Sequence, residues 1–232
     1  MNVRNTILKL LTWKLNVLAR LTLRRYAPGV VAITGSVGKT STKEALRAVL
    51  AHKYRVRAAA KSFNNEIGVP LTVISGAEKS GGVFFWIGAI LAACARLVVR
   101  SRDYPEVLVL EYAIDRPGDM NHLIRIAAPD VAVMTAIGDG PPVHVEFFTG
   151  PEAVLHEKAK LVKALPSDGF AILNADDLKV MSVADLAKGH VTTYGFEEGA
   201  NVRLSNFRNE LEECEAAIHF KIEHKETIVP VV

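Results

Sequence analysis

The stretch Val30-Val-Ala-Ile-Thr-Gly35-Ser-Val-Gly38-Lys39-Thr40-Ser41 decides the fold that we predict for this chain. An apolar strand pattern ends in two glycines three residues apart, and a helical pattern starts directly after the second. Glycines let backbone N–H groups turn inward around phosphate oxygens, and the N-terminus of the following helix adds its positive dipole. The stretch therefore predicts a phosphate-binding loop. Its form is shorter than the common Walker pattern, which has glycine where this chain has Ile33.

Two side chains of this loop carry chemistry of their own. In a phosphate loop, the ammonium group of Lys39 would reach the β- and γ-phosphates of a nucleotide, and the Thr40 hydroxyl would be a ligand of Mg²⁺. The residues predicted to hold the nucleotide are Gly35, Ser36, Val37, Gly38, Lys39, Thr40 and Ser41.

Strand patterns alternate with helical patterns as far as residue 195. Most of the strand patterns are near-continuous apolar runs, typical of strands covered on both faces, and helical segments of about 10–15 residues separate them. This order predicts an α/β fold with a mostly parallel sheet and helices on both faces. The predicted strands are 29–34, 54–60, 106–111, 130–135, 170–174 and 191–194, and the predicted helices are 40–52, 118–128, 151–165 and 176–187. After residue 201 the pattern alternates, which predicts antiparallel strands at 202–207, 216–222 and 227–232.

The composition excludes several classes of protein. Of the 232 residues, 50% are hydrophobic and 23% are charged, which allows a sizeable core and excludes wholesale disorder. The two cysteines, Cys94 and Cys214, cannot form a disulfide framework or a zinc site, so we expect a reduced, cytosolic setting. Residues 1–28 hold 6 of the 28 basic residues and no acid, which leaves 22 basic against 25 acidic residues in the rest. This mildly acidic remainder argues against a nucleic-acid groove.

The basic leader, residues 4–25, has the spacing of an amphipathic helix. Its apolar face holds Ile7, Leu8, Leu11, Leu15 and Leu18. Lysines within the apolar run argue against a secretory signal. Two interpretations stay open: a helix packed on its own domain or on a partner, and a helix lying on an anionic membrane surface.

A second apolar stretch, residues 83–95, is uncharged and has helical spacing. It is shorter than the roughly 20 apolar residues that a bilayer span needs. We expect a buried or membrane-touching helix rather than a transmembrane one.

Candidate metal ligands follow two of the predicted strands. Glu111 ends an apolar strand, and ligands bind at the carboxyl ends of strands in a parallel sheet. A carboxylate beside a nucleotide suits Mg²⁺, which prefers oxygen ligands. His144 follows the next buried strand and a Gly/Pro-rich loop, with Asp139 and Glu146 as weaker candidates.

Other polar residues have plainer interpretations. Asp115 and Asp119 fit a turn and a helix cap, and Asn64 and Asn65 fit a turn before a helix. The lysines of the predicted helix 151–165 would ordinarily form a solvated face, and composition does not single out one of them. They are Lys158, Lys160 and Lys163.

Taken together, these segments resemble the Mur ligases, ATP-dependent amide-forming enzymes of peptidoglycan synthesis. The matching segments occur in the family's order, and the ordered set is specific although each segment alone is modest. They are 33–44 (Ile-Thr-Gly-Ser-Val-Gly-Lys-Thr-Ser-Thr-Lys-Glu), 64–72 (Asn-Asn-Glu-Ile-Gly-Val-Pro-Leu-Thr), 109–111 (Val-Leu-Glu), 116–120 (Arg-Pro-Gly-Asp-Met), 128–132 (Ala-Pro-Asp-Val-Ala), 144–146 (His-Val-Glu), 157–160 (Glu-Lys-Ala-Lys) and 168–177 (Asp-Gly-Phe-Ala-Ile-Leu-Asn-Ala-Asp-Asp).

The resemblance implies that Lys39 holds the γ-phosphate of ATP and that Thr40 and Glu111 bind Mg²⁺. It implies that His144 serves a second Mg²⁺ and that Lys158 is the carbamylated, metal-binding lysine of the family. CO₂ adds only to a neutral amine, and a lysine of ordinary pKa is only roughly 0.1% neutral near pH 7.4. A nearby Mg²⁺ would favour the deprotonated form, so the modification should be linked to the metal.

Four further residues gain roles only from the resemblance. Asn65, with Asn64 as the less certain choice, would lie near the reacting phosphate and join Lys39, His144 and Lys158 as a catalytic residue. Asn174 and Asp177 would lie near the nucleotide.

The implied reaction phosphorylates the carboxylate of a UDP-MurNAc-peptide with ATP to give an acyl phosphate. The amine of D-Ala-D-Ala then attacks, giving an amide, ADP and phosphate. The resemblance implies a cytoplasmic enzyme, and the leader allows contact with the inner face of the membrane.

The implied domain organisation has three parts. Residues 1–28 are the amphipathic helix, residues 29–195 are the ATP-binding Mur ligase central domain, and residues 196–232 are antiparallel strands of the same domain. The family places a uridine-nucleotide domain before the phosphate loop and an amine-presenting domain after the central one. We therefore expect a piece that binds ATP but does not complete ligation alone.

The chain departs from the family pattern in two further places. Lys160 stands where an acid is common, and the five residues between Gly138 and His144 are more than the pattern has. Two other functions stay open: a folylpolyglutamate-synthase-like ligase, and a nucleotide-binding scaffold or regulatory protein at the membrane that lacks ligation. The short leader and the apolar helix favour the last slightly.

Overall fold

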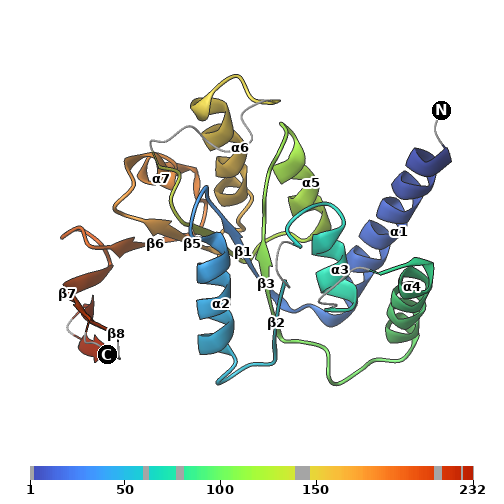
Figure 1. Ribbon diagram of the computed structural model, residues 1–232, viewed down its shortest axis with the longest axis horizontal. Helices are drawn as coiled ribbons and strands as arrows, with labels where there is room; N and C mark the ends of the chain where they lie inside the picture. The colour runs from blue at the N-terminus through green and yellow to red at the C-terminus, as the bar shows by residue number, and fades with distance from the viewer. Residues whose placement is uncertain are drawn as a thin grey trace.

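The computed structural model describes residues 3–59, 63–76, 81–138, 147–211, 216–225 and 227–231. Within them, nine strands form one sheet in the order β2-β3-β1-β4-β5-β6-β7-β8-β9 (Figure 1). The neighbours from β2 to β7 pair in parallel, whereas β7–β8 and β8–β9 are antiparallel. The strands are β1 (Gly29–Thr34), β2 (Val56–Ala58), β3 (Val107–Glu111), β4 (Val131–Met134), β5 (Phe170–Asn174), β6 (His190–Gly195), β7 (Val202–Leu211), β8 (Ala216–His224) and β9 (Thr227–Val231).

Helices cover both faces of the sheet, because alternate residues of each buried strand point to opposite sides. Helix α2 packs on one face, where Leu46 and Leu50 lie against a small cluster around Ile33 and Val109. A larger cluster fills the other face beneath the remaining helices. The helices are α1 (Val3–Tyr26), α2 (Lys39–Leu50), α3 (Gly68–Ile74), α4 (Val83–Val98), α5 (Asp119–Ile126), α6 (Pro151–Lys163) and α7 (Leu178–Met181), with a 3₁₀ turn η2 (Ala184–Leu186). The predicted α/β fold with a mostly parallel sheet is confirmed.

The strand order reverses beside β1. After β1 the chain builds β2 and β3 on one side, and it then crosses to place β4 on the other side. In open α/β sheets, ligands bind in the crevice at the carboxyl ends of the strands at such a reversal. The carboxyl end of β1 leads directly into the glycine loop 35–38, so the topology places the predicted phosphate loop at this point.

Several predicted boundaries differ from the structure. The predicted helix 176–187 is broken into α7 and η2, and the predicted strand 54–60 is reduced to β2. The predicted strand ends at Phe207, whereas β7 continues to Leu211. Between Ser205 and Arg208 the register of β7 against β8 shifts, and Asn206 has φ +52°. An irregularity of this kind interrupts the period-two alternation on which the prediction relied.

Helix α1 confirms the predicted leader helix, but its apolar face divides into two halves. Leu15 and Ala19 are fully buried against the domain, whereas Ile7 and Leu8 are exposed. In Figure 1 the N-terminal half of α1 projects away from the sheet. Among the described helices, none combines the length and the apolar content that a bilayer crossing requires.

Candidate nucleotide-binding site

The glycine loop after β1 has the backbone that a phosphate loop needs. Gly35 has φ +150°, and a Cβ atom there would lie 1.9 Å from Thr135 Oγ1. Gly38, with φ +83°, is the N-cap of α2. The Thr135 hydroxyl donates to the Val37 carbonyl over 2.6 Å and so ties the loop to the end of β4. The loop is therefore held in place from a neighbouring strand, with the N-terminus of α2 behind it.

Lys39 lies over this loop. Its Nζ donates to the carbonyl oxygens of Gly35 and Ser36 at 2.9 and 3.1 Å. Burial lowers the pKa of Lys39, and the negative charge of Glu111 partly opposes that shift. The ammonium group is thus placed on the inside of the loop, where phosphate oxygens would lie.

Glu111 lies at the carboxyl end of β3 and is only 3% exposed. One carboxylate oxygen accepts from the Thr40 hydroxyl at 3.2 Å, and the other accepts from Asn64 Nδ2 at 3.2 Å. Thr40 and Glu111 therefore place two adjacent oxygen atoms beside the glycine loop, a set of ligand atoms that fits the preference of Mg²⁺.

Lys158 reaches the same place from α6. Its Nζ donates to Ser36 Oγ over 3.0 Å, and the residue is 6% exposed. Burial first, and the positive charge of Lys39 second, together lower the pKa of Lys158 to about 8. A cavity of about 390 Å³ is lined by residues of this group, including Ser36, Lys39, Asn64, Glu111 and Lys158. Side chains from β1–α2, β3 and α6 thus converge on one cleft.

The two asparagines before α3 have different positions. Asn64 contacts Glu111 inside the cleft. Asn65 accepts from the backbone N–H groups of Ile67 and Gly68 at 3.2 and 2.9 Å, and it lines a small hollow beside the cleft. The structure therefore brings Asn64, the less certain choice, to the predicted metal ligand, and gives Asn65 the role of closing the turn before α3.

His144 lies outside the described residues, as do Asp139 and Glu146. Within the described residues, no group of three or more His, Cys, Asp and Glu side chains is arranged to hold a metal ion. The second Mg²⁺ site inferred for His144 and Lys158 therefore stays a prediction.

Asn174 and Asp177 lie at and just beyond the carboxyl end of β5. Asp177 caps α7 and also accepts from the backbone N–H groups of Ile137 and Gly138 at 2.7 and 2.9 Å. Burial alone would raise the pKa of Asp177, but these hydrogen bonds and those of the α7 cap outweigh it, so the pKa is lowered. Asn174 Oδ1 accepts from the N–H of Asp176. Both side chains shape the loops that border the site.

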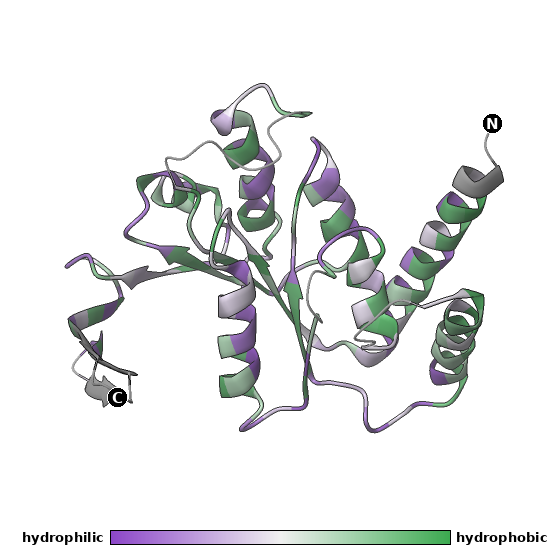
Figure 2. Cartoon of the chain, in the orientation of Figure 1, coloured by the Kyte–Doolittle hydropathy of each residue, from purple (hydrophilic) through white to green (hydrophobic). Residues whose placement is uncertain are grey.

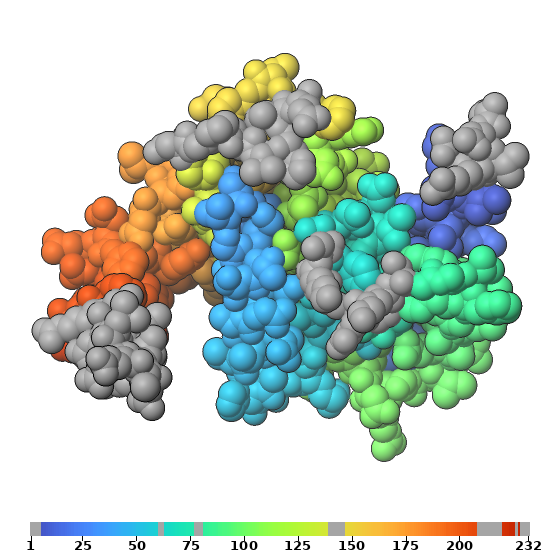
Figure 3. All heavy atoms as spheres, in the orientation of Figure 1, coloured from blue at the N-terminus to red at the C-terminus, as the bar shows by residue number. Residues whose placement is uncertain are grey.

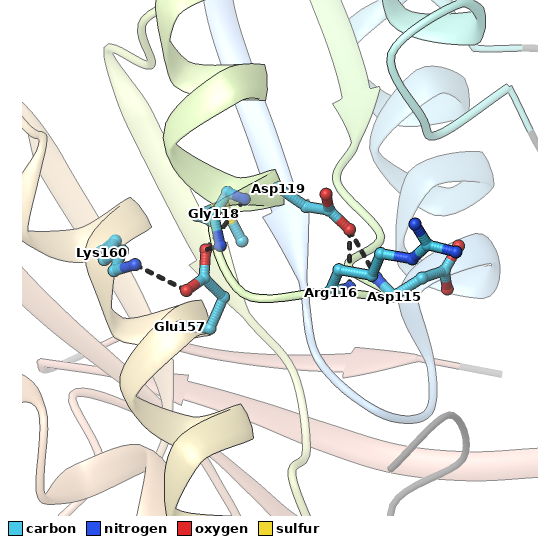
Figure 4. A network of polar contacts seen from close by, with 7 residues as sticks. Asp115, Arg116, Gly118, Asp119, Glu157 and Lys160 are labelled. Carbon is cyan, nitrogen blue, oxygen red and sulfur yellow. Dashed lines mark hydrogen bonds and ion pairs between the residues drawn. The ribbon is translucent and has the colours of Figure 1, made fainter. Parts of the chain in front are cut away.

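Sequence reasoning missed the role of Glu157, which holds α6 against the start of α5 (Figure 4). Its buried carboxylate accepts from the N–H groups of Gly118 and Met120 at the start of α5, at 3.0 and 3.1 Å. It also pairs with Lys160 at 2.5 Å. Because Glu157 directly precedes Lys158, its contact with the start of α5 fixes α6 close to Lys158. No local pattern indicates it, because its backbone partners lie nearly 40 residues earlier in the chain.

The sequence suggested a helix cap for Asp119, but the N-cap of α5 is Gly118, without a side-chain cap, and Asp119 serves the preceding turn instead. One of its carboxylate oxygens accepts from the N–H groups of Asp115 and Arg116 at 2.9 and 2.7 Å (Figure 4). The contact closes the turn that leads into α5, while Asp115 lines the cleft beside Lys158.

Comparisons with known proteins identify relatives of this chain. The Mur ligase middle domain matches residues 33–85 and 92–231. The UDP-N-acetylmuramoyl-tripeptide–D-alanyl-D-alanine ligase of Bacillus subtilis is 32% identical over 160 residues, and that of Mycobacterium bovis is 35% identical over 162 residues. These matches cover 69% and 70% of this chain but only 29% and 26% of the two relatives. The chain thus spans between a quarter and a third of the length of these curated relatives.

Solved structures show the same fold. The MurF ligase of Thermotoga maritima in complex with ADP has a TM-score of 0.72 and 29% identity, and the match covers 95% of this chain and 44% of that chain. MurF of Acinetobacter baumannii, at 22% identity and a TM-score of 0.71, shares the fold; that match covers 94% of this chain and 41% of that chain. The middle-domain match over most of its length shows that the chain belongs to the Mur ligase family.

Proposed function

We propose that this chain binds ATP with Mg²⁺ in the cleft and is the ATP-binding part of an amide ligase of peptidoglycan precursor synthesis. One observation carries the proposal: Lys39, Glu111 and Lys158, which are far apart in the sequence, lie together around the glycine loop. The ADP complex of the Thermotoga maritima relative supports the choice of an adenine nucleotide.

Most of these residues have a role that their position supports. The loop N–H groups and Lys39 hold the phosphates, and the N-terminus of α2 adds its dipole. Thr40 and Glu111 would hold Mg²⁺, which would neutralise negative charge on the transferring phosphoryl group. Asn64 keeps Glu111 in place, and Asn174 and Asp177 border the nucleotide. Asn65 and His144 stay candidates for catalysis from the resemblance alone.

Lys158 is proposed to be carbamylated and to bind metal. Its lowered pKa makes the modification chemically reasonable, because at a pKa of about 8 roughly a fifth of the amine is neutral near pH 7.4. That neutral share is about two hundred times larger than for a lysine of ordinary pKa. Ser36 Oγ already accepts from Nζ and would orient the group.

For substrates, the names of the relatives point to a UDP-N-acetylmuramoyl-tripeptide and D-Ala-D-Ala. We propose that the peptide carboxylate takes the γ-phosphoryl group of ATP, and that the amine of D-Ala-D-Ala then displaces phosphate to form the amide. We also propose a cytoplasmic location, with residues 4–25 in contact with the inner face of the membrane.

The test is ATP binding by titration calorimetry with and without Mg²⁺. Replacement of Lys39 by alanine should weaken the affinity roughly 10- to 100-fold, the equivalent of one lost charge-assisted contact. The matched control is Lys163→Ala, an exposed lysine of α6, which should bind as the wild type does. Equal affinities of the wild type and Lys39→Ala, or binding that does not depend on Mg²⁺, would contradict the proposal.

A further inference from the structure

Helix α4 exposes an apolar face. Residues 83–95 contain no charged residue, and Arg96 is the first charge of the helix. Ala89 and Ala93 pack against the domain, while Phe84 is 90% exposed, Val98 79% and Leu91 63%. Figure 2 shows α4 as hydrophobic around most of its circumference. A helix that is apolar all round is normally buried, and a contiguous exposed apolar face marks an interaction site.

Helix α1 lies beside α4 at the same end of the molecule (Figure 3). Its solvent side exposes Leu10, Trp13 and Leu21, and Trp13 is 60% exposed. Basic residues flank these side chains, and neither α1 nor α4 contains an aspartate or glutamate. The exposed basic side chains of α1 are Lys9, Lys14, Arg20, Arg24 and Arg25. We call the exposed side chains of the two helices the α1–α4 surface.

More positive charge lies where the two helices end. Arg25 of α1 donates to the Val98 carbonyl at the end of α4, over 3.2 Å. Directly beyond α4, Arg100 and Arg102 line a cavity of about 660 Å³ together with Arg55, which pairs with Glu106. This cavity is larger than the nucleotide cleft, and its excess of arginine suits phosphate groups.

Helix α1 lies wholly outside the family match, and α4 lies partly outside it. The middle-domain match starts at residue 33 and omits residues 86–91, which are part of α4. The α1–α4 surface is therefore built largely from segments that the shared ATP-binding fold does not require.

We infer that the α1–α4 surface binds the surface of an anionic phospholipid bilayer: the apolar side chains of α4 and α1 enter the interface, and the basic side chains contact lipid phosphates. This inference deepens the membrane contact proposed above for residues 4–25 and rests on it. A basic helix with an exposed tryptophan, beside a helix with an exposed apolar face, combines the charge and the apolar side chains that bind such interfaces. A second copy of the chain fits less well, because two surfaces rich in positive charge and without acids would repel each other.

The test is co-sedimentation of the whole 232-residue chain with vesicles of phosphatidylcholine, alone or mixed with phosphatidylglycerol. The chain should bind the mixed vesicles and bind the neutral vesicles at least tenfold more weakly, and added salt should reduce binding. Lys14→Gln together with Arg24→Gln should lower the partition coefficient roughly 20- to 30-fold, at about 1 kcal/mol for each charge near the surface. Phe84→Ser together with Leu91→Ser should lower it at least tenfold.

Two controls make the result specific. Val49→Ser changes an exposed valine of α2, away from this surface, and should bind vesicles as the wild type does. In a Trp86→Phe variant, Trp13 is the remaining tryptophan of the two, so its emission should shift to shorter wavelength on addition of mixed vesicles. The ATP affinity of every variant is measured in parallel, so that failure of membrane binding and failure of nucleotide binding can be told apart.

Three results would overturn the inference. They are no binding to mixed vesicles, equal binding to both kinds of vesicle, and a dimer in solution that the Phe84→Ser and Leu91→Ser pair dissociates. Unchanged thermal unfolding of that pair would show that any loss of binding does not come from misfolding.

Discussion

The candidate nucleotide-binding cleft and the α1–α4 surface depart from the usual distribution of residues, charged outside and apolar inside, in opposite directions. In the cleft, Lys158 and Glu111 are charged side chains that are nearly fully buried, and each has polar partners from distant elements. On the α1–α4 surface, Phe84 and Leu91 are large apolar side chains that are mostly exposed. A buried charge reduces stability unless polar partners or a ligand compensate, whereas an exposed apolar face costs little stability and instead marks an interaction site. The comparison therefore indicates two binding regions, of which only the cleft gives up stability for binding.

The largest effect is expected from Gly35→Ala in the cleft. The new Cβ would lie 1.9 Å from Thr135 Oγ1, at a φ of +150° that side chains rarely adopt. We expect a loss of about 3 kcal/mol in the free energy of unfolding, from strain and overpacking together. Chemical denaturation measures it, and ATP affinity should fall with it. Gly199→Ala is the matched control, because a Cβ there meets nothing within 4 Å. A Gly35→Ala variant as stable as Gly199→Ala would show that the loop is not held as described.

A smaller effect, this time a gain in the free energy of unfolding, is expected from Lys158→Met. The folded-state pKa of Lys158, about 8, lies below its ordinary 10.5, so the folded protein bears the full cost of the buried charge below pH 8. That cost is relieved as pH rises from 8 to 10.5, where the buried amine has lost its proton. Without Mg²⁺, the free energy of unfolding of the variant at pH 7 should exceed that of the wild type by about 1–2 kcal/mol, which raises Tm by a few degrees.

The pH profile of this gain is the decisive measurement. The difference in Tm between Lys158→Met and the wild type should shrink above pH 8. Lys163→Met, at an exposed position of the same helix, should change Tm little at any pH. A gain that is the same at pH 7 and pH 10 would show that buried charge is not its cause.

The smallest effect is expected from Phe84→Ser on the α1–α4 surface. Phe84 is 90% exposed, so its removal should change the free energy of unfolding by less than about 0.5 kcal/mol, as measured by chemical denaturation. Ala93→Asp, on the buried face of the same helix, should instead be strongly destabilising, because it places a carboxylate among apolar side chains. If both substitutions cost the same, the two faces of α4 do not differ as described.

Local patterns predicted the site only where the chemistry is local. The phosphate loop was predicted because its glycines, Lys39 and Thr40 are contiguous, and Glu111 because an apolar run ends on it. Composition and local pattern could not tell the three lysines of α6 apart, and only the family resemblance singled out Lys158. In the structure, Lys158 is buried in the cleft, Lys160 pairs with Glu157 and Lys163 is exposed.

The amino-acid sequence by itself determined the alternation of strands and helices, the phosphate loop and the basic, apolar character of the leader, because each depends on residues a few positions apart. The tertiary structure decided which asparagine contacts Glu111, which lysine reaches Ser36, and how Glu157 holds α6 against α5. The Lys158–Ser36 contact joins residues 122 positions apart, and it exists only when α6 packs over the carboxyl end of β1. No local sequence pattern predicts a contact between residues so far apart in the chain, because the contact depends on how the helices pack on the sheet.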